Sequence, residues 1–238
     1  MTRWIVSALV ALPACAAAAA DTDVVPVPSK ECVFVVHGLA RGNRSMAKLS
    51  MRLSRAGYAV VKVDYPSTKG SFRDMVFALA RAVDLHGTSC GKVHFVGYSL
   101  GALVVRGYLE EASLPRLGRV VLIAPPNHGS QIADALSRFR EFGKLMGPVA
   151  TQLGTAPEDI PGQLESPRYR LGIIAGDRSI NPLGWLFIPG KHDGTVSVAS
   201  ARLDGMSDFL LVHRTHPFIM NAPEVAKATI RFLRSGSF

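Results

Sequence analysis

The feature that most restricts the fold of this chain is a regular alternation of short apolar, β-branched runs with longer amphipathic stretches. The strand-like runs occupy residues 32–36, 58–64, 92–96, 119–124, 170–175 and 208–213. Near-continuous apolar strands that alternate with helices are typical of a parallel sheet covered by helices on both faces. The sequence therefore predicts one α/β domain with a mostly parallel sheet of about six strands.

Helical periodicity fills the intervals between most of these runs. The expected helices occupy residues 43–56, 71–85, 100–111 and 221–233. The second opens with a Ser71-x-x-Asp74 capping box, and Asn221 is the expected N-cap of the last. The segment from about residue 130 to residue 167 breaks the alternation. It holds several prolines and an amphipathic piece with Ile132, Leu136, Phe139, Leu145 and Met146.

A long insertion between two core strands is more typical of a functional lid than of a structureless loop. We therefore expect a lid-like insertion at about 130–167, within a single domain that spans residues 21–238.

Residues 1–20 have the pattern of a secretory signal peptide: a basic start at Arg3, an apolar run, a break at Pro13 and a tract of small residues. Cleavage after Ala19 or Ala20 would deliver a secreted or periplasmic protein. A minor alternative is a lipoprotein, because the residues before Cys15 resemble a lipobox and would make that cysteine a lipidated N-terminus.

Composition excludes several classes of protein. A hydrophobic share of 48% is too high for an intrinsically disordered chain, and 3 Cys cannot build a disulfide-rich miniprotein. The net charge of +9 comes without a Lys/Arg run or a basic helix, so we expect a solvated basic surface and no nucleic acid partner. No His/Cys/Asp cluster has ligand spacing, so no metal or organic cofactor is expected.

The strongest local motif is Gly97-Tyr98-Ser99-Leu100-Gly101. It follows an apolar strand and precedes a helical run, which is the strand–turn–helix setting of a nucleophile elbow. Side chains in place of the two glycines would clash in so sharp a turn. We therefore expect Ser99 to be a catalytic nucleophile.

A serine hydroxyl needs a general base, and the base needs an acid that orients it. The base follows the last strand, where His216 is preferred over His213 because it lies in the loop before the C-terminal helix. The acid is expected between nucleophile and base in chain order. Asp193, beside a glycine that permits a tight turn, is preferred over Asp177.

The oxyanion of the intermediate needs two backbone donors. One is the N–H of Leu100, directly after the nucleophile. The other is the N–H of Leu39, in the His37-Gly38-Leu39 loop that follows the first strand.

Together these motifs make the chain resemble an α/β-hydrolase, specifically the bacterial lipase and esterase branch. The stretches that carry the resemblance are His37-Gly38-Leu39, Gly97-Tyr98-Ser99-Leu100-Gly101, Pro126-Asn127-His128-Gly129-Ser130, Asp193-Gly194-Thr195-Val196 and His216-Pro217-Phe218. The resemblance implies a triad of Ser99, Asp193 and His216. It also implies a small-molecule acyl ester or lipid as substrate, cleaved through an acyl-enzyme, and transient contact with a lipid surface.

Two alternative functions stay open at this point. A thioesterase, an amidase or an acyltransferase uses the same triad, and a non-catalytic binding protein can retain the same fold. The apolar stretch 183–188 is either part of an acyl pocket or an ordinary core segment.

The resemblance also bears on the cysteines. Signal-peptide cleavage removes Cys15 and leaves Cys32 and Cys90 in an oxidising compartment. In the sheet that the chain resembles, the strands next to these two residues are parallel neighbours. We therefore expect a Cys32–Cys90 disulfide, with a pair of buried free thiols as the alternative.

Overall fold

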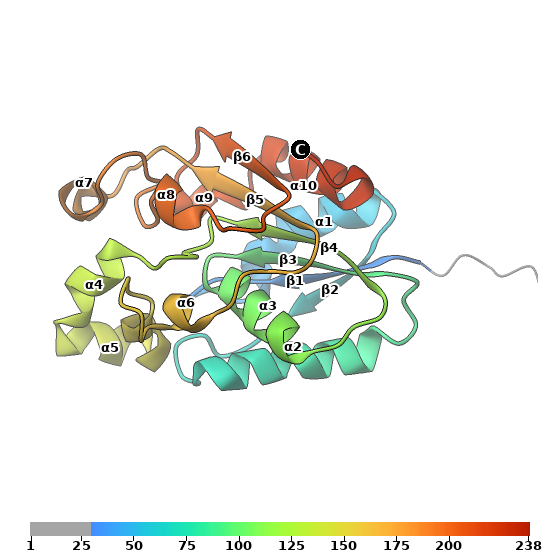
Figure 1. The fold of residues 1–238 in the computed structure, drawn as a ribbon, viewed down its shortest axis with the longest axis horizontal. Helices are drawn as coiled ribbons and strands as arrows, with labels where there is room; N and C mark the ends of the chain where they lie inside the picture. The colour runs from blue at the N-terminus through green and yellow to red at the C-terminus, as the bar shows by residue number, and fades with distance from the viewer. Residues whose placement is uncertain (1–29) are drawn as a thin grey trace, which may run out of the picture.

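The structure is a computed structural model and describes residues 30–238. The expected signal peptide, its cleavage sites and Cys15 lie outside the described residues. A parallel sheet of six strands, in the order β2-β1-β3-β4-β5-β6, forms the centre of the molecule (Figure 1). The strands are β1 (Cys32–Val36), β2 (Ala59–Val63), β3 (Val93–Tyr98), β4 (Leu117–Ile123), β5 (Leu171–Gly176) and β6 (Asp208–Val212). The predicted fold class is confirmed, and each run of the sequence pattern corresponds to one strand.

Helices cover both faces of this sheet. They are η1 (Asn43–Met46), α1 (Ala47–Arg55), α2 (Phe72–His86), α3 (Leu100–Glu111), α4 (Gln131–Ser137), α5 (Arg140–Met146), η2 (Pro148–Gln152), α6 (Ile160–Gln163), α7 (Pro182–Phe187), α8 (Val198–Ala201), α9 (His216–Ile219) and α10 (Pro223–Ser235). Successive strand side chains point to opposite faces. Phe34 and Phe95 therefore pack with α2 and α3, whereas Val35 and Val96 pack with α1 and α10 on the other face.

Helix boundaries follow local chemistry. The predicted capping box is present: the Ser71 side chain accepts from the Asp74 N–H, and the Asp74 carboxylate accepts from the Ser71 N–H. The expected N-cap at Asn221 is wrong. α10 begins at Pro223 with Ala222 as its N-cap, because proline is favoured at the first helical position and so moves the cap to the residue before it.

The segment between β4 and β5 folds into short helices: α4, α5, η2 and α6. Its two ends are attached to the buried side chain of Arg106 on α3. The Arg106 Nη1 donates to Asn127 Oδ1 at 3.1 Å, and Nη2 donates to the carbonyl oxygens of Leu164 at 2.9 Å and Glu165 at 3.1 Å. The helix α3, which follows Ser99, is therefore also bonded to both ends of the insertion.

A disulfide joins Cys32 and Cys90, with a Cα–Cα distance of 5.7 Å. This is the pairing that the resemblance implied. Cys32 is level with Val93 in the β1–β3 ladder, so Cys90 lies just before the strand and reaches across from its loop. The bond lies at the N-terminal ends of both strands, away from the carboxyl ends. Within residues 30–238 no helix combines the length and apolar character that crossing a bilayer requires.

Candidate active site

The turn between β3 and α3 presents Ser99 at the carboxyl end of the sheet. Ser99 has φ 54°, an unusual conformation for a residue with a side chain. The flanking glycines allow it. A Cβ on Gly97 would lie 2.6 Å from Ala102 Cα, and one on Gly101 would overlap the carbonyl oxygens of Val36 and His37. Gly101 therefore allows α3 to approach the end of β1 closely, and Gly97 allows the tight turn from β3 into α3, as expected from the motif.

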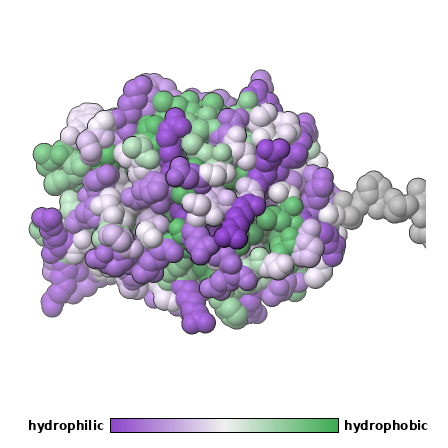
Figure 2. Space-filling model, viewed as in Figure 1, coloured by the Kyte–Doolittle hydropathy of each residue, from purple (hydrophilic) through white to green (hydrophobic). Residues whose placement is uncertain are grey.

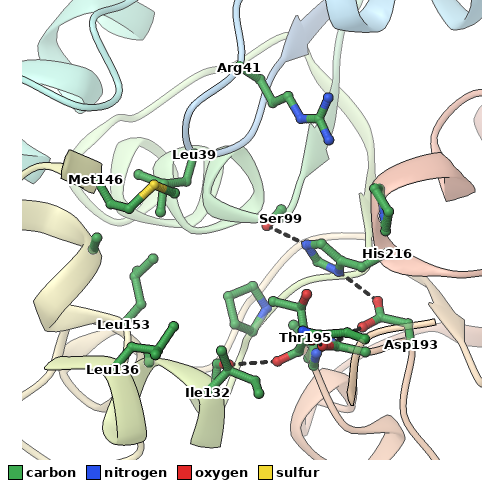
Figure 3. A pocket seen from close by; sticks show the side chains of 18 of the residues that line it. Leu39, Arg41, Ser99, Ile132, Leu136, Met146, Leu153, Asp193, Thr195 and His216 are labelled. Atoms are coloured by element: carbon green, nitrogen blue, oxygen red, sulfur yellow. Dashed lines mark hydrogen bonds and ion pairs between the residues drawn. The ribbon is translucent and has the colours of Figure 1, made fainter. Parts of the chain in front are cut away.

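Ser99, His216 and Asp193 lie in one hydrogen-bonded row (Figure 3). The Ser99 Oγ is 2.9 Å from His216 Nε2, and His216 Nδ1 is 2.7 Å from Asp193 Oδ2. Both His216 and Asp193 are buried, while Ser99 is partly exposed. The structure thus brings together the three side chains that the sequence pattern selected.

Backbone contacts fix the orientation of the histidine and the carboxylate. Asp193 Oδ1 accepts from the N–H groups of Thr195 at 2.9 Å and Val196 at 2.8 Å, which leaves Oδ2 for the imidazole ring. The His216 N–H donates to the Asp193 carbonyl at 2.9 Å. The Tyr98 hydroxyl donates to the His216 carbonyl at 2.8 Å. The tight turn at Gly194 lets the two amides reach back to their own carboxylate.

The other candidate acid and base form a separate pair. The His213 Nδ1 is 2.9 Å from Asp177 Oδ1, and the imidazole of His213 is 74% exposed. Neither residue is among those that line the cavity at Ser99. The order of residues along the chain allows either pairing, and only the paths of the loops after β5 and β6 separate them.

The two expected oxyanion donors lie beside the serine. A Cβ on Gly38 would lie 3.1 Å from Ser99 Cβ, so the segment that ends at Leu39 passes next to Ser99. The first amide of α3, that of Leu100, has no acceptor within the helix. None of the hydrogen bonds among residues 30–238 uses the Leu39 or the Leu100 N–H, so both remain available to a substrate oxygen.

His37 and Tyr65 contact each other and support the backbone of the Leu39 loop. The Tyr65 hydroxyl donates to the His37 carbonyl oxygen, and the two rings stack with centroids 4.2 Å apart. His37 Nδ1 lies 2.9 Å from the Gly38 carbonyl oxygen, within hydrogen-bond distance. Burial lowers the pKa of His37 and raises that of Tyr65, so both rings stay neutral at pH 7. The loop is therefore fixed before any substrate arrives.

A cavity of about 540 Å³ opens beside Ser99. The insertion supplies much of its apolar wall: Ile132, Ala133, Leu136, Phe142, Met146, Ala150 and Leu153. The amphipathic piece identified in the sequence, residues 132–146, has some apolar side chains at the cavity and others in solvent. Its members Phe139 and Leu145 are exposed, whereas the others face the cavity or pack beside it.

The expectation that residues 183–188 line the cavity or the core is wrong for most of this stretch. The rim is formed by the preceding residues, 180–182, and α7 points outward. The side chains of Trp185 and Leu186 are 67% and 72% exposed. Within the short α7, only Gly184 is buried, because its lack of a side chain lets the helix pack against Gly194 and His192.

Arg41 is a charged lining residue that the sequence motifs did not single out. Its position two residues after Leu39 was the one available sign. In the part of the chain that the structure describes, no group of three or more His, Cys, Asp or Glu side chains is placed to hold a metal ion.

Comparisons with known proteins agree with this architecture. Residues 33–228 match the alpha/beta hydrolase family. Similar solved structures include the Bacillus licheniformis lipase BlEst2 in its mature form, with 21% identity, a TM-score of 0.66, and coverage of 87% of this chain and 94% of that one. Phospholipase PlaB from Legionella pneumophila has 16% identity and a TM-score of 0.70, covering 87% and 61% of the two chains.

A metagenomic carboxyl esterase, MGS0156, is also similar, with 20% identity, a TM-score of 0.63, and coverage of 89% of this chain and 79% of that one. At these low identities the solved structures show a shared fold only. The match to the family model, by contrast, spans residues 33–228, which is most of the chain. The chain belongs to the α/β hydrolase family.

Proposed function

We propose that this protein is a serine hydrolase that cleaves carboxylic esters whose acyl part is apolar. The observation that carries the proposal is the hydrogen-bonded row from Ser99 Oγ through His216 to Asp193. All three residues line a cavity whose wall is mostly apolar. A nucleophile, its base and the orienting carboxylate in hydrogen-bond contact are the arrangement that acyl transfer requires.

In the first half of the reaction, the Ser99 Oγ attacks the ester carbonyl carbon while His216 Nε2 takes the hydroxyl proton. The carbonyl oxygen becomes an oxyanion, which the N–H groups of Leu39 and Leu100 stabilise. The Asp193 carboxylate stabilises the imidazolium that forms. The tetrahedral intermediate then collapses: the C–O bond to the alcohol breaks, and His216 returns the proton to the leaving oxygen.

In the second half, water attacks the acyl group on Ser99. His216 takes a proton from this water, the tetrahedral intermediate forms again, and the bond to Ser99 Oγ breaks as the serine regains its proton. The products are a carboxylic acid, ionised at neutral pH, and the regenerated enzyme. No step needs a metal ion or an organic cofactor.

The insertion at about 130–167 acts as a lid over the acyl side of the site. Its support is the number of apolar cavity residues that it contributes and its attachment, at both ends, to Arg106. An apolar wall of this kind accommodates a hydrocarbon chain and excludes water from the acyl-enzyme.

A lipid surface fits the exposed face of α7. This helix begins at the cavity rim, since Pro182 lines the cavity, and Figure 2 shows a hydrophobic patch at this end of the molecule. Trp185 is the single tryptophan of residues 21–238 and therefore reports on this face alone. Adding phospholipid vesicles should shift its fluorescence to the blue, and Leu186→Ser should weaken the binding. An unchanged spectrum at saturating lipid would exclude the contact.

We also propose that the protein is exported to the periplasm or the medium. Export is supported by the Cys32–Cys90 disulfide, because such bonds persist in oxidising compartments and are rare in the cytosol.

A series of p-nitrophenyl esters, assayed beside acyl thioesters and amides, tests the proposed function. Ser99→Ala should lose on the order of 10⁴-fold or more in kcat, because the triad works as a unit. A fluorophosphonate probe should label the wild type at Ser99 and fail to label Ser99→Ala.

Ser89→Ala is the matched control, since Ser89 is exposed and lies before β3, at the other end of that strand from Ser99. Labelling that persists in Ser99→Ala, or faster turnover of thioesters or amides than of esters, would contradict the proposal.

A further inference from the structure

Arg41 is the one lining residue of the Ser99 cavity, among those described, with a permanent positive charge. It follows the oxyanion loop by two residues. Figure 3 shows its side chain across Ser99 from Ile132 and Leu136, with the guanidinium extending to the His216 side. The cation therefore lies away from the apolar wall that the insertion builds.

No carboxylate of residues 30–238 pairs with this guanidinium, and none of the hydrogen bonds in this range uses it. Asp64 contacts the same loop but is engaged elsewhere: its Oδ1 accepts from the Asn43 N–H at 3.3 Å and lies 3.4 Å from His37 Nε2. Asp193, the carboxylate of the cavity, is bound to His216.

The backbone around Arg41 is held in place. Ala40 has φ 51°, a left-handed conformation that residues with a side chain rarely adopt. The Ser67 hydroxyl donates to the Arg41 carbonyl at 3.4 Å, and the Ser45 hydroxyl donates to the Gly42 carbonyl at 2.7 Å. A strained residue persists where the surrounding structure requires it, and such residues are concentrated at ligand sites.

The charge of Arg41 also acts on the site. Burial raises the pKa of the Tyr98 hydroxyl, and the negative charge of Asp193 raises it further, while Arg41 acts in the opposite direction. Tyr98 in turn donates to the carbonyl oxygen of His216 at 2.8 Å, so Arg41, Tyr98 and His216 lie on the same side of the cavity.

The two sides of Ser99 therefore suit different parts of an ester. The apolar wall suits the acyl chain, and His216, which protonates the leaving oxygen, marks the alcohol side. A guanidinium binds phosphate or carboxylate oxygens through paired hydrogen bonds. Resting on the proposed esterase function, we infer that Arg41 selects esters whose alcohol part carries an anionic phosphate or carboxylate group.

Three butyrate esters with the same acyl group test this inference: those of glycerol, of glycerol 3-phosphate and of glycerate. For the wild type, kcat/KM should be roughly tenfold higher for at least one anionic ester than for the glycerol ester. The preference should shrink at high ionic strength, because salt screens an exposed cation. The two anionic esters show separately whether phosphate or carboxylate is the preferred group.

Arg41→Gln should bring the ratio of kcat/KM between the anionic and the neutral ester close to one. Arg41→Lys, which keeps the charge without the planar fork, should retain part of it. Arg44→Gln is the matched control: Arg44 is exposed on η1, three residues away, and does not line the cavity. Its ratio should equal that of the wild type.

The same experiment distinguishes a failure of the esterase function from a failure of the role inferred for Arg41. If the wild type hydrolyses none of the three esters and Ser99 is not labelled, the esterase function fails and the inference with it. If all three are hydrolysed with equal kcat/KM, only the inference fails. An equal loss on all three esters in Arg41→Gln would also overturn it, because Arg41 would then assist the oxyanion or the fold rather than the choice of alcohol.

Discussion

At the scale of single residues, backbone strain is concentrated where the chemistry is proposed. The non-glycine residues with positive φ among residues 30–238 are Ala40, Ser99 and Ala124. They follow β1, β3 and β4, which are adjacent strands, so all three lie at the carboxyl edge of the sheet. In open parallel sheets this edge is where ligands bind. Its strained turns present Ser99 and Arg41 toward one cavity.

The choice between two carboxylates gives a prediction at this scale. Asp193→Asn should lower kcat by about 10⁴-fold, because an amide cannot hold the imidazole in the tautomer that accepts the serine proton. Asp177→Asn is the matched change at the exposed pair with His213 and should leave the ester kinetics near those of the wild type. Steady-state kinetics on a p-nitrophenyl ester compares them. A dead Asp177→Asn beside an active Asp193→Asn would reverse the assignment of the acid.

At the scale of elements, the insertion is divided into a cavity-facing and a solvent-facing side. Leu136 on α4 lines the cavity, while Leu145 on α5 is 78% exposed. Periodicity marks both as apolar, since it describes the face of a helix but not what that face meets.

Leu136→Trp should shift the substrate preference toward shorter acyl chains, because the larger ring occupies space that a long chain would fill. The same substitution at the exposed site, Leu145→Trp, should leave the preference unchanged. The measurement is kcat/KM across p-nitrophenyl esters of increasing chain length. If both variants keep the wild-type profile, the insertion does not form the acyl side of the site.

At the scale of the whole molecule, the disulfide and the site lie at opposite ends of the same strands. The bond joins Cys32 at the start of β1 to Cys90 just before β3, two residues that are 58 positions apart in the sequence. Removing it should lower the free energy of unfolding by about 2–4 kcal/mol, because the unfolded chain regains conformational freedom.

Thiol titration of the denatured, unreduced mature protein should find no free thiols. The double variant Cys32→Ala with Cys90→Ala should unfold at lower denaturant concentration, while the folded protein keeps its specific activity. Two free thiols in the wild type would show that the bond does not form in the cell.

Much of the fold is predictable from local sequence patterns. β-branched runs mark the strands, because their periodicity follows from the geometry of the backbone itself. The capping box at Ser71 and the elbow at Ser99 depend on a few adjacent residues, so their sequences suffice to place them. The predicted N-cap of α10 is wrong by one residue, because Pro223 takes the first helical position and so makes Ala222 the cap.

The partners within the site depend on the tertiary structure. Asp193 and His216 are separated by 23 residues, and only the paths of the loops after β5 and β6 decide that they meet while Asp177 meets His213. The exposure of α7 and the position of Arg41 at the cavity were likewise decided by packing. By itself the sequence determined the sheet and the turn that presents the proposed nucleophile, because these follow from local backbone geometry. The folded chain decided which side chains share the cavity, because contacts between residues far apart in sequence leave no local pattern.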